Sequence, residues 1–98
     1  MDISTKKDGN SLVISVSGRV DTVTAPEFEK RITENIDGVS ELVLDLKDMT
    51  YTSSSGLRVI LRAQKLMNKQ GSMKVTNVRD EVMEIFDVTG FSDILNIE

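Results

Sequence analysis

Residues 42–67, LVLDLKDMTYTSSSGLRVILRAQKLM, constrain the fold most, because the hydrophobic pattern changes its period within them. Residues 42–46 carry four branched apolar side chains in a nearly continuous run, which predicts a central strand covered on both sides. From Leu57 onward apolar residues recur at helical spacing, which predicts an amphipathic helix packed against a sheet. A strand followed at once by such a helix indicates an α/β fold.

Four hydroxyl residues and a glycine connect this strand to this helix: Thr52, Ser53, Ser54, Ser55 and Gly56. One interpretation is structural, because a hydroxyl residue just before a helix is the commonest N-cap and this composition is ordinary for a loop. The other is a phosphate site, because unpaired N–H groups and the helix dipole favour an anion at a helix N-terminus. The residues alone favour the first interpretation.

The first part of the chain predicts a hairpin and then a helix. Residues 3–7 and 11–20 flank an Asp-Gly turn and should pair antiparallel, with a bulge or close backbone approach at Gly18. Residues 24–27, Thr-Ala-Pro-Glu, predict a helix start with a reciprocal capping box between Thr24 and Glu27. That helix should bury Phe28, Ile32 and Ile36 and end near Gly38.

The last part of the chain predicts a strand over residues 73–78 and a helix that ends at Gly90. Residues 91–97 either add a short fifth strand or only seal the core, and the sequence does not choose between these. The order of elements implies a mixed four- to five-stranded sheet with an N-terminal antiparallel hairpin and helices packed mainly on one face. We expect residues 1–98 to form one domain.

The composition argues against several functions. The chain has no histidine and no cysteine, so it lacks the commonest general base, the commonest metal ligand and any disulfide. The formal net charge of −4 argues against nucleic-acid binding, and no apolar run is long enough to span a membrane. We therefore expect a cytoplasmic protein that is not an enzyme and that needs no metal or cofactor.

Asp45 and Asp48 lie three residues apart near the end of the predicted strand. Such a pair suggests a Mg²⁺ site, but Mg²⁺ usually needs substrate phosphates as well, and no phosphate-binding glycine loop is present. The favoured interpretation is that Asp45 accepts hydrogen bonds from turn amides and that Asp48 is solvated.

A basic stripe is predicted on the helix after the serines, where Arg58, Arg62, Lys65 and Lys69 recur at helical spacing. Its simpler interpretation is a solvated helix face. Because the stripe begins one turn from the serines, its alternative role is to steer an acidic partner toward them.

Five short motifs together resemble one known family. They are Gly18-Arg19-Val20-Asp21 ahead of Thr24-Ala25, then Leu44-Asp45-Leu46, Ser54-Ser55-Gly56-Leu57 and Phe86-Asp87-Val88-Thr89-Gly90. In this order and at these spacings the chain resembles the bacterial anti-sigma factor antagonists, which are built on the STAS domain that also forms the cytoplasmic ends of sulfate transporters. The resemblance covers nearly the whole chain.

The resemblance implies an antagonist that binds an anti-sigma factor and so releases a sigma factor. The expected partner is an anti-sigma factor that is also a serine/threonine kinase and holds the ATP, and its phosphorylation of the serine loop switches binding off. Aligned on Gly56-Leu57, the phosphoacceptor is Ser54, with Ser55 and Ser53 as lesser candidates. Residues expected to face the partner are Asp21, Thr22, Ser53, Ser54, Ser55, Gly56 and Arg58.

Further expectations concern Ser53, the alternative function, Asp21 and the oligomeric state. The chain departs from the family pattern at Ser53, where an aspartate is frequent, so the local charge is lower and other hydroxyls compete as acceptors. The alternative function is a non-phosphorylated STAS scaffold or a regulatory subunit of a transporter or signalling complex. Asp21 is either a simple loop carboxylate or, by the resemblance, part of the partner-facing surface. We expect the protein to be a monomer.

Overall fold

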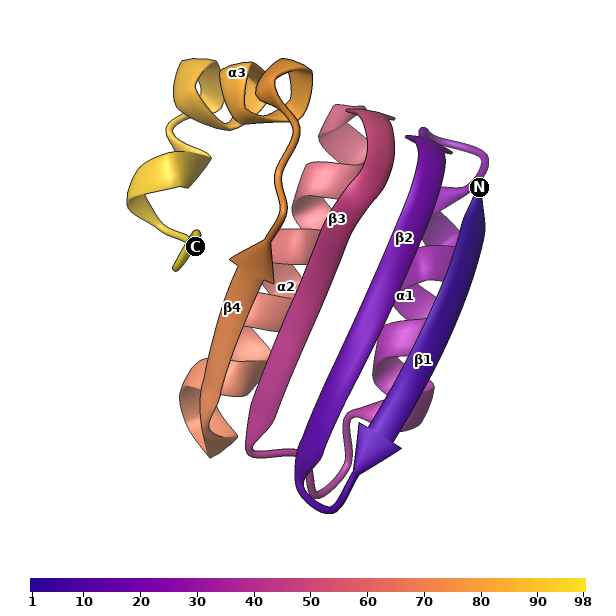
Figure 1. The fold of residues 1–98 in the computed structure, drawn as a ribbon, viewed down its shortest axis with the longest axis vertical. Helices are drawn as coiled ribbons and strands as arrows, with labels where there is room; N and C mark the ends of the chain where they lie inside the picture. The colour runs from indigo at the N-terminus through magenta and orange to yellow at the C-terminus, as the bar shows by residue number, and fades with distance from the viewer.

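The computed structural model describes all of residues 1–98 and has the predicted order of elements (Figure 1). The strands are β1 (Asp2–Asp8), β2 (Ser11–Val20), β3 (Glu41–Thr52) and β4 (Ser72–Thr76). The helices are α1 (Ala25–Asn35), α2 (Ser54–Gln70) and α3 (Asp80–Thr89), followed by the single-turn 3₁₀ helix η1 (Phe91–Asp93).

The four strands form one mixed sheet in the order β1-β2-β3-β4. β1 pairs antiparallel with β2, while β2–β3 and β3–β4 are parallel. Each parallel pair is joined through a helix, and Figure 1 shows α1 and α2 on the same side of the sheet, as crossovers of one hand require. The predicted α/β architecture is therefore confirmed, and α3 packs near the end of β3.

The first hairpin turns at Gly9 and Asn10, since Asp8 pairs with Ser11. Gly9 has φ +60° and is the first of the two turn residues, the position at which a type II′ turn requires glycine. The hairpin places both β1 termini at the ends of β2 and leaves β1 as one edge of the sheet.

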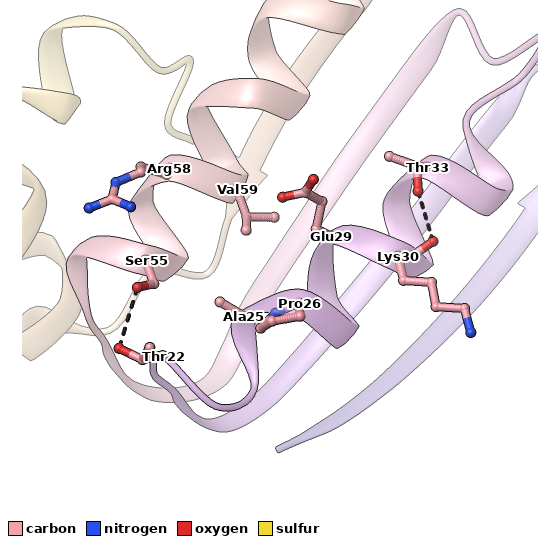
Figure 2. Close-up of a pocket in the computed structure, with 9 residues that line it drawn as sticks. All are labelled: Thr22, Ala25, Pro26, Glu29, Lys30, Thr33, Ser55, Arg58 and Val59. Carbon is pink, nitrogen blue, oxygen red and sulfur yellow. Dashed lines mark hydrogen bonds between the residues drawn. The ribbon is translucent and has the colours of Figure 1, made fainter.

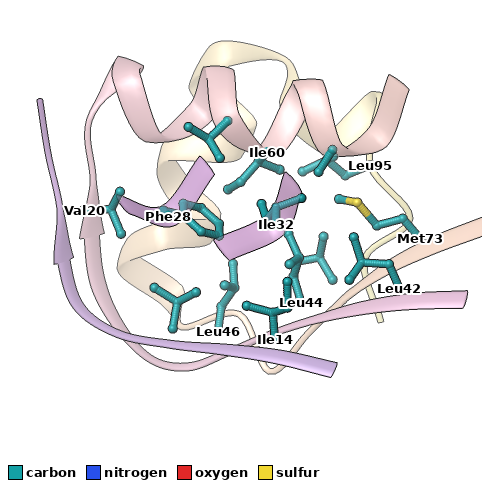
Figure 3. Close-up of a cluster of buried hydrophobic side chains, with 14 of the residues drawn as sticks. Ile14, Val20, Phe28, Ile32, Leu42, Leu44, Leu46, Ile60, Met73 and Leu95 are labelled. Carbon is teal, nitrogen blue, oxygen red and sulfur yellow. The ribbon is translucent and has the colours of Figure 1, made fainter. Parts of the chain in front are cut away.

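The core lies between the sheet and the helices α1 and α2 (Figure 3). Leu42, Leu44 and Leu46 of β3 point into it and are at most 1% exposed. Val43 is half-buried on the other face, where no helix covers it. The prediction that this strand is covered on both sides is therefore wrong. Val43 is instead shielded by its neighbours Val13 and Lys74 in the flanking strands.

β3 runs to Thr52, much farther than the apolar run that predicted it. Two register shifts against β2 each place one extra residue on β3, between Asp45 and Asp48 and between Met49 and Tyr51. Bulges of this kind change which side chains face the core. They return Thr52 to the buried side of the sheet just before the serines.

The C-terminal segment seals the core without adding a full strand. Gly90 ends α3 in the left-handed conformation, as predicted, with φ +81°. Leu95 is buried, and Ile97 forms a single parallel bridge to Val75. One bridge covers part of the β4 edge, so the sheet has four strands.

Candidate functional site

The serine turn, which we define as residues 53–55, joins β3 to α2 at the end of the sheet where β2 and β3 terminate (Figure 1). Ser53 is extended, with φ −85° and ψ 177°, and its amide donates to the Val20 carbonyl at 2.8 Å. The helix begins at Ser54, whereas the apolar pattern of the sequence marked it only from Leu57 onward. Ser54 is therefore the first helical residue and Ser53 occupies the N-cap position.

Gly56 sets how closely the first turn of α2 approaches the sheet. A Cβ atom at this position would overlap the Thr52 hydroxyl and come within 2.8 Å of Val20 Cγ1. Gly56 itself is buried and its φ is not in the left-handed region, so the requirement for glycine here is steric.

The three serine hydroxyls of the turn have different surroundings. Ser53 Oγ is buried and has no hydrogen-bond partner. Ser55 is half-buried, and its Oγ lies 3.4 Å from Thr22 Oγ1. Ser54 is exposed and makes no side-chain hydrogen bond within the protein. Exposure therefore distinguishes Ser54 from its two neighbours, which the sequence did not do.

The loop between β2 and α1 lies beside this turn and is organised by Asp21. Its Oδ1 accepts hydrogen bonds from the amides of Val23 at 3.0 Å and Thr24 at 3.1 Å. The Thr24 hydroxyl accepts from the Asp21 amide at 2.9 Å and lies 3.2 Å from Asp21 Oδ1. The pKa of the Asp21 carboxyl lies below its ordinary value, chiefly because the Thr24 amide donates a hydrogen bond to it. Desolvation opposes this shift, while the Thr24 hydroxyl, the Val23 amide and the Arg19 charge add to it.

The capping box predicted between Thr24 and Glu27 is wrong. Thr24 occupies the N-cap position, but its backbone is helical there and its side chain caps no amide of α1. The Thr24 amide, to which Glu27 was expected to bond, is bound by Asp21 instead. Asp21, three residues before Thr24, thus makes the hydrogen bond that the predicted capping box assigned to Glu27.

A groove of about 440 Å³ runs along α1, between it and the first two turns of α2 (Figure 2). Figure 2 shows the Thr22–Ser55 hydrogen bond at one end of the groove and Arg58 on the next turn of α2. Its lining combines hydroxyls, charged groups and a few apolar side chains, namely Thr22, Ala25, Pro26, Glu29, Lys30, Thr33, Ser55, Arg58 and Val59.

The basic stripe on α2 is exposed along its whole length, at Arg58, Arg62, Lys65 and Lys69. Only Arg62 is engaged, because its Nη1 lies 3.1 Å from Glu29 Oε1 of α1. The part of the stripe nearest the serine turn is therefore a single unpaired guanidinium, that of Arg58.

The structure brings most of the predicted partner-facing residues together. Thr22, Ser54 and Arg58 are exposed, and Asp21, Ser53 and Ser55 are half-buried beside them. Gly56 lies beneath this surface and shapes it. Sequence reasoning missed the groove, because its lining comes from two helices and no single segment carries a signal for it.

Asp45 has the structural role that the sequence favoured. Its Oδ1 accepts from the Lys47 amide and from Asn77 Nδ2, each at 3.1 Å. Asp48 is exposed on the uncovered face of the sheet. No group of three or more potential metal ligands is present.

None of the helices is both long enough and apolar enough to cross a membrane.

Comparison with known proteins identifies the family to which this fold belongs. The family model of the STAS domain matches residues 2–98, so the chain belongs to the STAS domain family. Within that family its relatives are anti-sigma factor antagonists. The anti-sigma-B factor antagonist of Bacillus subtilis is 30% identical over 98 residues, a match that covers 99% of this chain and 90% of the relative. Membership in this group makes the chain a regulatory binding protein and not an enzyme, as the sequence predicted.

Solved structures agree with this assignment. An anti-sigma factor antagonist from Mycobacterium paratuberculosis is 25% identical and superposes with a TM-score of 0.89, covering 98% of this chain and 83% of the other. The Bacillus cell fate determinant SpoIIAA in its phosphorylated form is 15% identical, with a TM-score of 0.77 over 99% of this chain and 91% of the other. At 15% identity the second match supports the fold alone.

Proposed function

We propose that the protein is a cytoplasmic anti-sigma factor antagonist that binds an anti-sigma factor with serine/threonine kinase activity. Binding releases the sigma factor, and phosphorylation of Ser54 by that kinase ends the interaction. The observation that carries this proposal is the position of Ser54, which is the exposed member of the serine turn and the first residue of α2.

Exposure supports Ser54 as the acceptor. A kinase must bring the acceptor oxygen in line with the γ-phosphate of its ATP, which a buried hydroxyl does not permit. Ser53 Oγ is buried and Ser55 Oγ is bonded to Thr22, so both have less access. Although Ser53 replaces an acid that is frequent in the family, it does not compete as an acceptor.

The transfer itself needs little from this chain. The Ser54 oxygen forms a bond to the γ-phosphorus of ATP as the bond from that phosphorus to the β–γ bridging oxygen breaks. ADP is the leaving group and remains in the kinase, and the proton of the Ser54 hydroxyl passes to a base of the kinase. This chain supplies only the nucleophile, the Ser54 hydroxyl, in an exposed position. The kinase supplies the base, so the reaction does not need a histidine from this chain.

The chain's own fold tolerates a phosphate at Ser54. The amides of Ser54, Ser55 and Gly56 have no hydrogen-bond partner, because they precede the first bond of the helix, from the Leu57 amide to the Ser53 carbonyl. α2 has no acidic residue in its first turn to repel the new charge. A dianion there faces the positive end of the helix dipole, so the fold remains intact.

A bound partner does not tolerate the same phosphate. A surface packed against a neutral serine would meet a hydrated dianion, and each buried polar group left without a hydrogen bond costs about 1–3 kcal/mol. One or two such losses weaken binding about tenfold to thousandfold, because 1.4 kcal/mol is a factor of ten.

The decisive experiment incubates the protein with its partner kinase and ATP, maps the modified residue by mass spectrometry and measures binding by calorimetry. Ser54→Ala should escape modification and bind constitutively, whereas Ser54→Asp should fold and bind weakly. Ser4→Ala, at an exposed serine of β1, is the matched control and should behave as the parent protein. Modification of Ser53 or Ser55 would contradict the assignment, and equal partner affinity after phosphorylation would favour the non-phosphorylated scaffold.

A further inference from the structure

Arg58 is the unpaired cation at the serine turn. Other cations near the turn are engaged, since Arg62 forms an ion pair with Glu29 and Arg19 lies over the ring of Tyr51 at 4.4 Å from its centre. Arg58 is exposed and takes part in no hydrogen bond, ion pair or ring contact of the protein. Its guanidinium is therefore available to a new anion.

Ser54 and Arg58 are separated by one turn of α2. Residues four apart on a helix are surface neighbours, and long helical side chains lean toward the N-terminus. Figure 2 shows Arg58 one turn beyond Ser55, with its guanidinium directed away from α1. The spacing of four residues therefore makes Arg58 a surface neighbour of Ser54 on α2.

No acid of α2 competes for Arg58. The helix, SSGLRVILRAQKLMNKQ, contains two arginines and two lysines and no aspartate or glutamate. A phosphate on Ser54 would be the first anion on this helix, and it would precede the arginine by four residues. This order, acid before base, is the favourable one for a helical pair.

We propose that Arg58 is an intramolecular phosphate clamp that pairs with Ser54 after its phosphorylation. This inference rests on the proposed function. It adds how phosphorylation of Ser54 changes the charge of the partner-facing surface. Phosphorylation introduces a dianion and at the same time withdraws the free guanidinium that the unmodified surface offers to an acidic partner. Arg58 thus has two roles: its guanidinium faces an acidic partner in the unmodified chain, and it pairs with the phosphate in the phosphorylated chain.

Arginine suits this role better than lysine. Its planar fork donates two parallel hydrogen bonds to two phosphate oxygens, whereas an ammonium interacts as a point charge. Neither Ser54 nor Arg58 must leave an existing partner to form the pair, so no other contact of the fold is lost.

The test uses the full chain carrying phosphoserine at position 54, incorporated during translation so that no kinase is needed. A ³¹P NMR titration then gives the second pKa of the phosphoserine, which is ordinarily about 6. A cation paired with the dianion lowers this pKa, and Arg58→Gln should raise it by at least about 0.3 relative to the parent chain. Arg58→Lys should restore part of the difference.

Arg62→Gln is the matched control, because it removes the same charge from the same helix at a residue already paired with Glu29. It should leave the titration within error of the parent chain. The Asp21 carboxylate in the adjacent loop is identical in all variants. Equal titrations for the parent and Arg58→Gln, or equal effects of the two substitutions, would overturn the clamp.

A second arm separates the clamp from the switching mechanism. With the partner available, Arg58→Gln should weaken binding of the unphosphorylated chain severalfold and leave the residual binding of the phosphorylated chain unchanged. An equal loss in both states contradicts the clamp. If phosphorylation does not alter affinity at all, the proposed function fails even where the titration shows the pair.

Discussion

The Oγ1 atom of Thr22 lies 3.4 Å from Oγ of Ser55, although the two residues are 33 positions apart in the chain. This contact joins the loop before α1 to the first turn of α2. It makes one continuous surface of two segments that lie far apart in the sequence, and it gives the Ser55 hydroxyl a partner that Ser54 lacks.

Thr22→Ala should lower the free energy of unfolding by less than about 1 kcal/mol, because the hydrogen bond is long and exposed. Ser55→Ala should have a similar effect, and the double variant should cost less than the sum. Urea unfolding of the four chains in a double-mutant cycle measures this. Strict additivity would show that the contact contributes nothing.

Gly56→Ala should destabilise the fold by about 2–4 kcal/mol, because the added Cβ overlaps Thr52 and Val20 beneath the serine turn. Ser54→Ala, two residues earlier and exposed, is the control and should cost at most about 1 kcal/mol. Thermal or urea unfolding tests both. A loss at Gly56 no larger than the loss at Ser54 would argue against the close approach.

The Asp21 carboxyl has a pKa below its ordinary value of 3.8, so its ionised form stabilises the folded state. This contribution is complete above the unfolded-state pKa and disappears as the pH falls through the lower, folded-state pKa. Asp21→Asn keeps an acceptor oxygen for the Val23 and Thr24 amides but cannot titrate. The urea midpoint of the parent chain should therefore fall more steeply below about pH 4 than that of Asp21→Asn. Parallel curves would contradict the prediction.

Arg58→Glu should slow association with an acidic partner severalfold at low salt and flatten the salt dependence of the rate. Lys69→Glu makes the same charge change in the last turn of α2, far from the serine turn, and should have a much smaller effect. Stopped-flow measurements over a range of salt concentrations decide this. Equal effects of the two substitutions would indicate that the basic stripe is only a solvated helix face.

Leu95→Ala should cost about 2–4 kcal/mol, because Leu95 is only 7% exposed and belongs to the hydrophobic core. The neighbouring Ile94 is 52% exposed, so Ile94→Ala should cost under about 0.5 kcal/mol. Denaturant unfolding of both variants tests whether the last segment seals the core. Equal small losses would show that it does not.

Much of the fold follows from local patterns. The period of apolar residues predicted the strand at 42–46 and the helix after Leu57, and the turn glycines Gly9 and Gly90 stand where a positive φ is needed. The length of β3 did not follow, because its second half is paired through two bulges rather than marked by an apolar run. The capping box failed for a related reason: Asp21, outside the motif, binds the amide that Glu27 was expected to bind.

The sequence by itself determined the order of elements and the position of the serine turn, because hydrophobic period, glycines and helix starts are properties of short segments. Only the tertiary structure decided which hydroxyl of the turn is open and which arginine of the stripe is free. The Ser55 hydroxyl lies within hydrogen-bonding distance of Thr22, and Arg62 forms an ion pair with Glu29. In each pair the two residues are 33 positions apart in the chain. Such contacts form only when the crossover through α1 and β3 places the starts of α1 and α2 side by side.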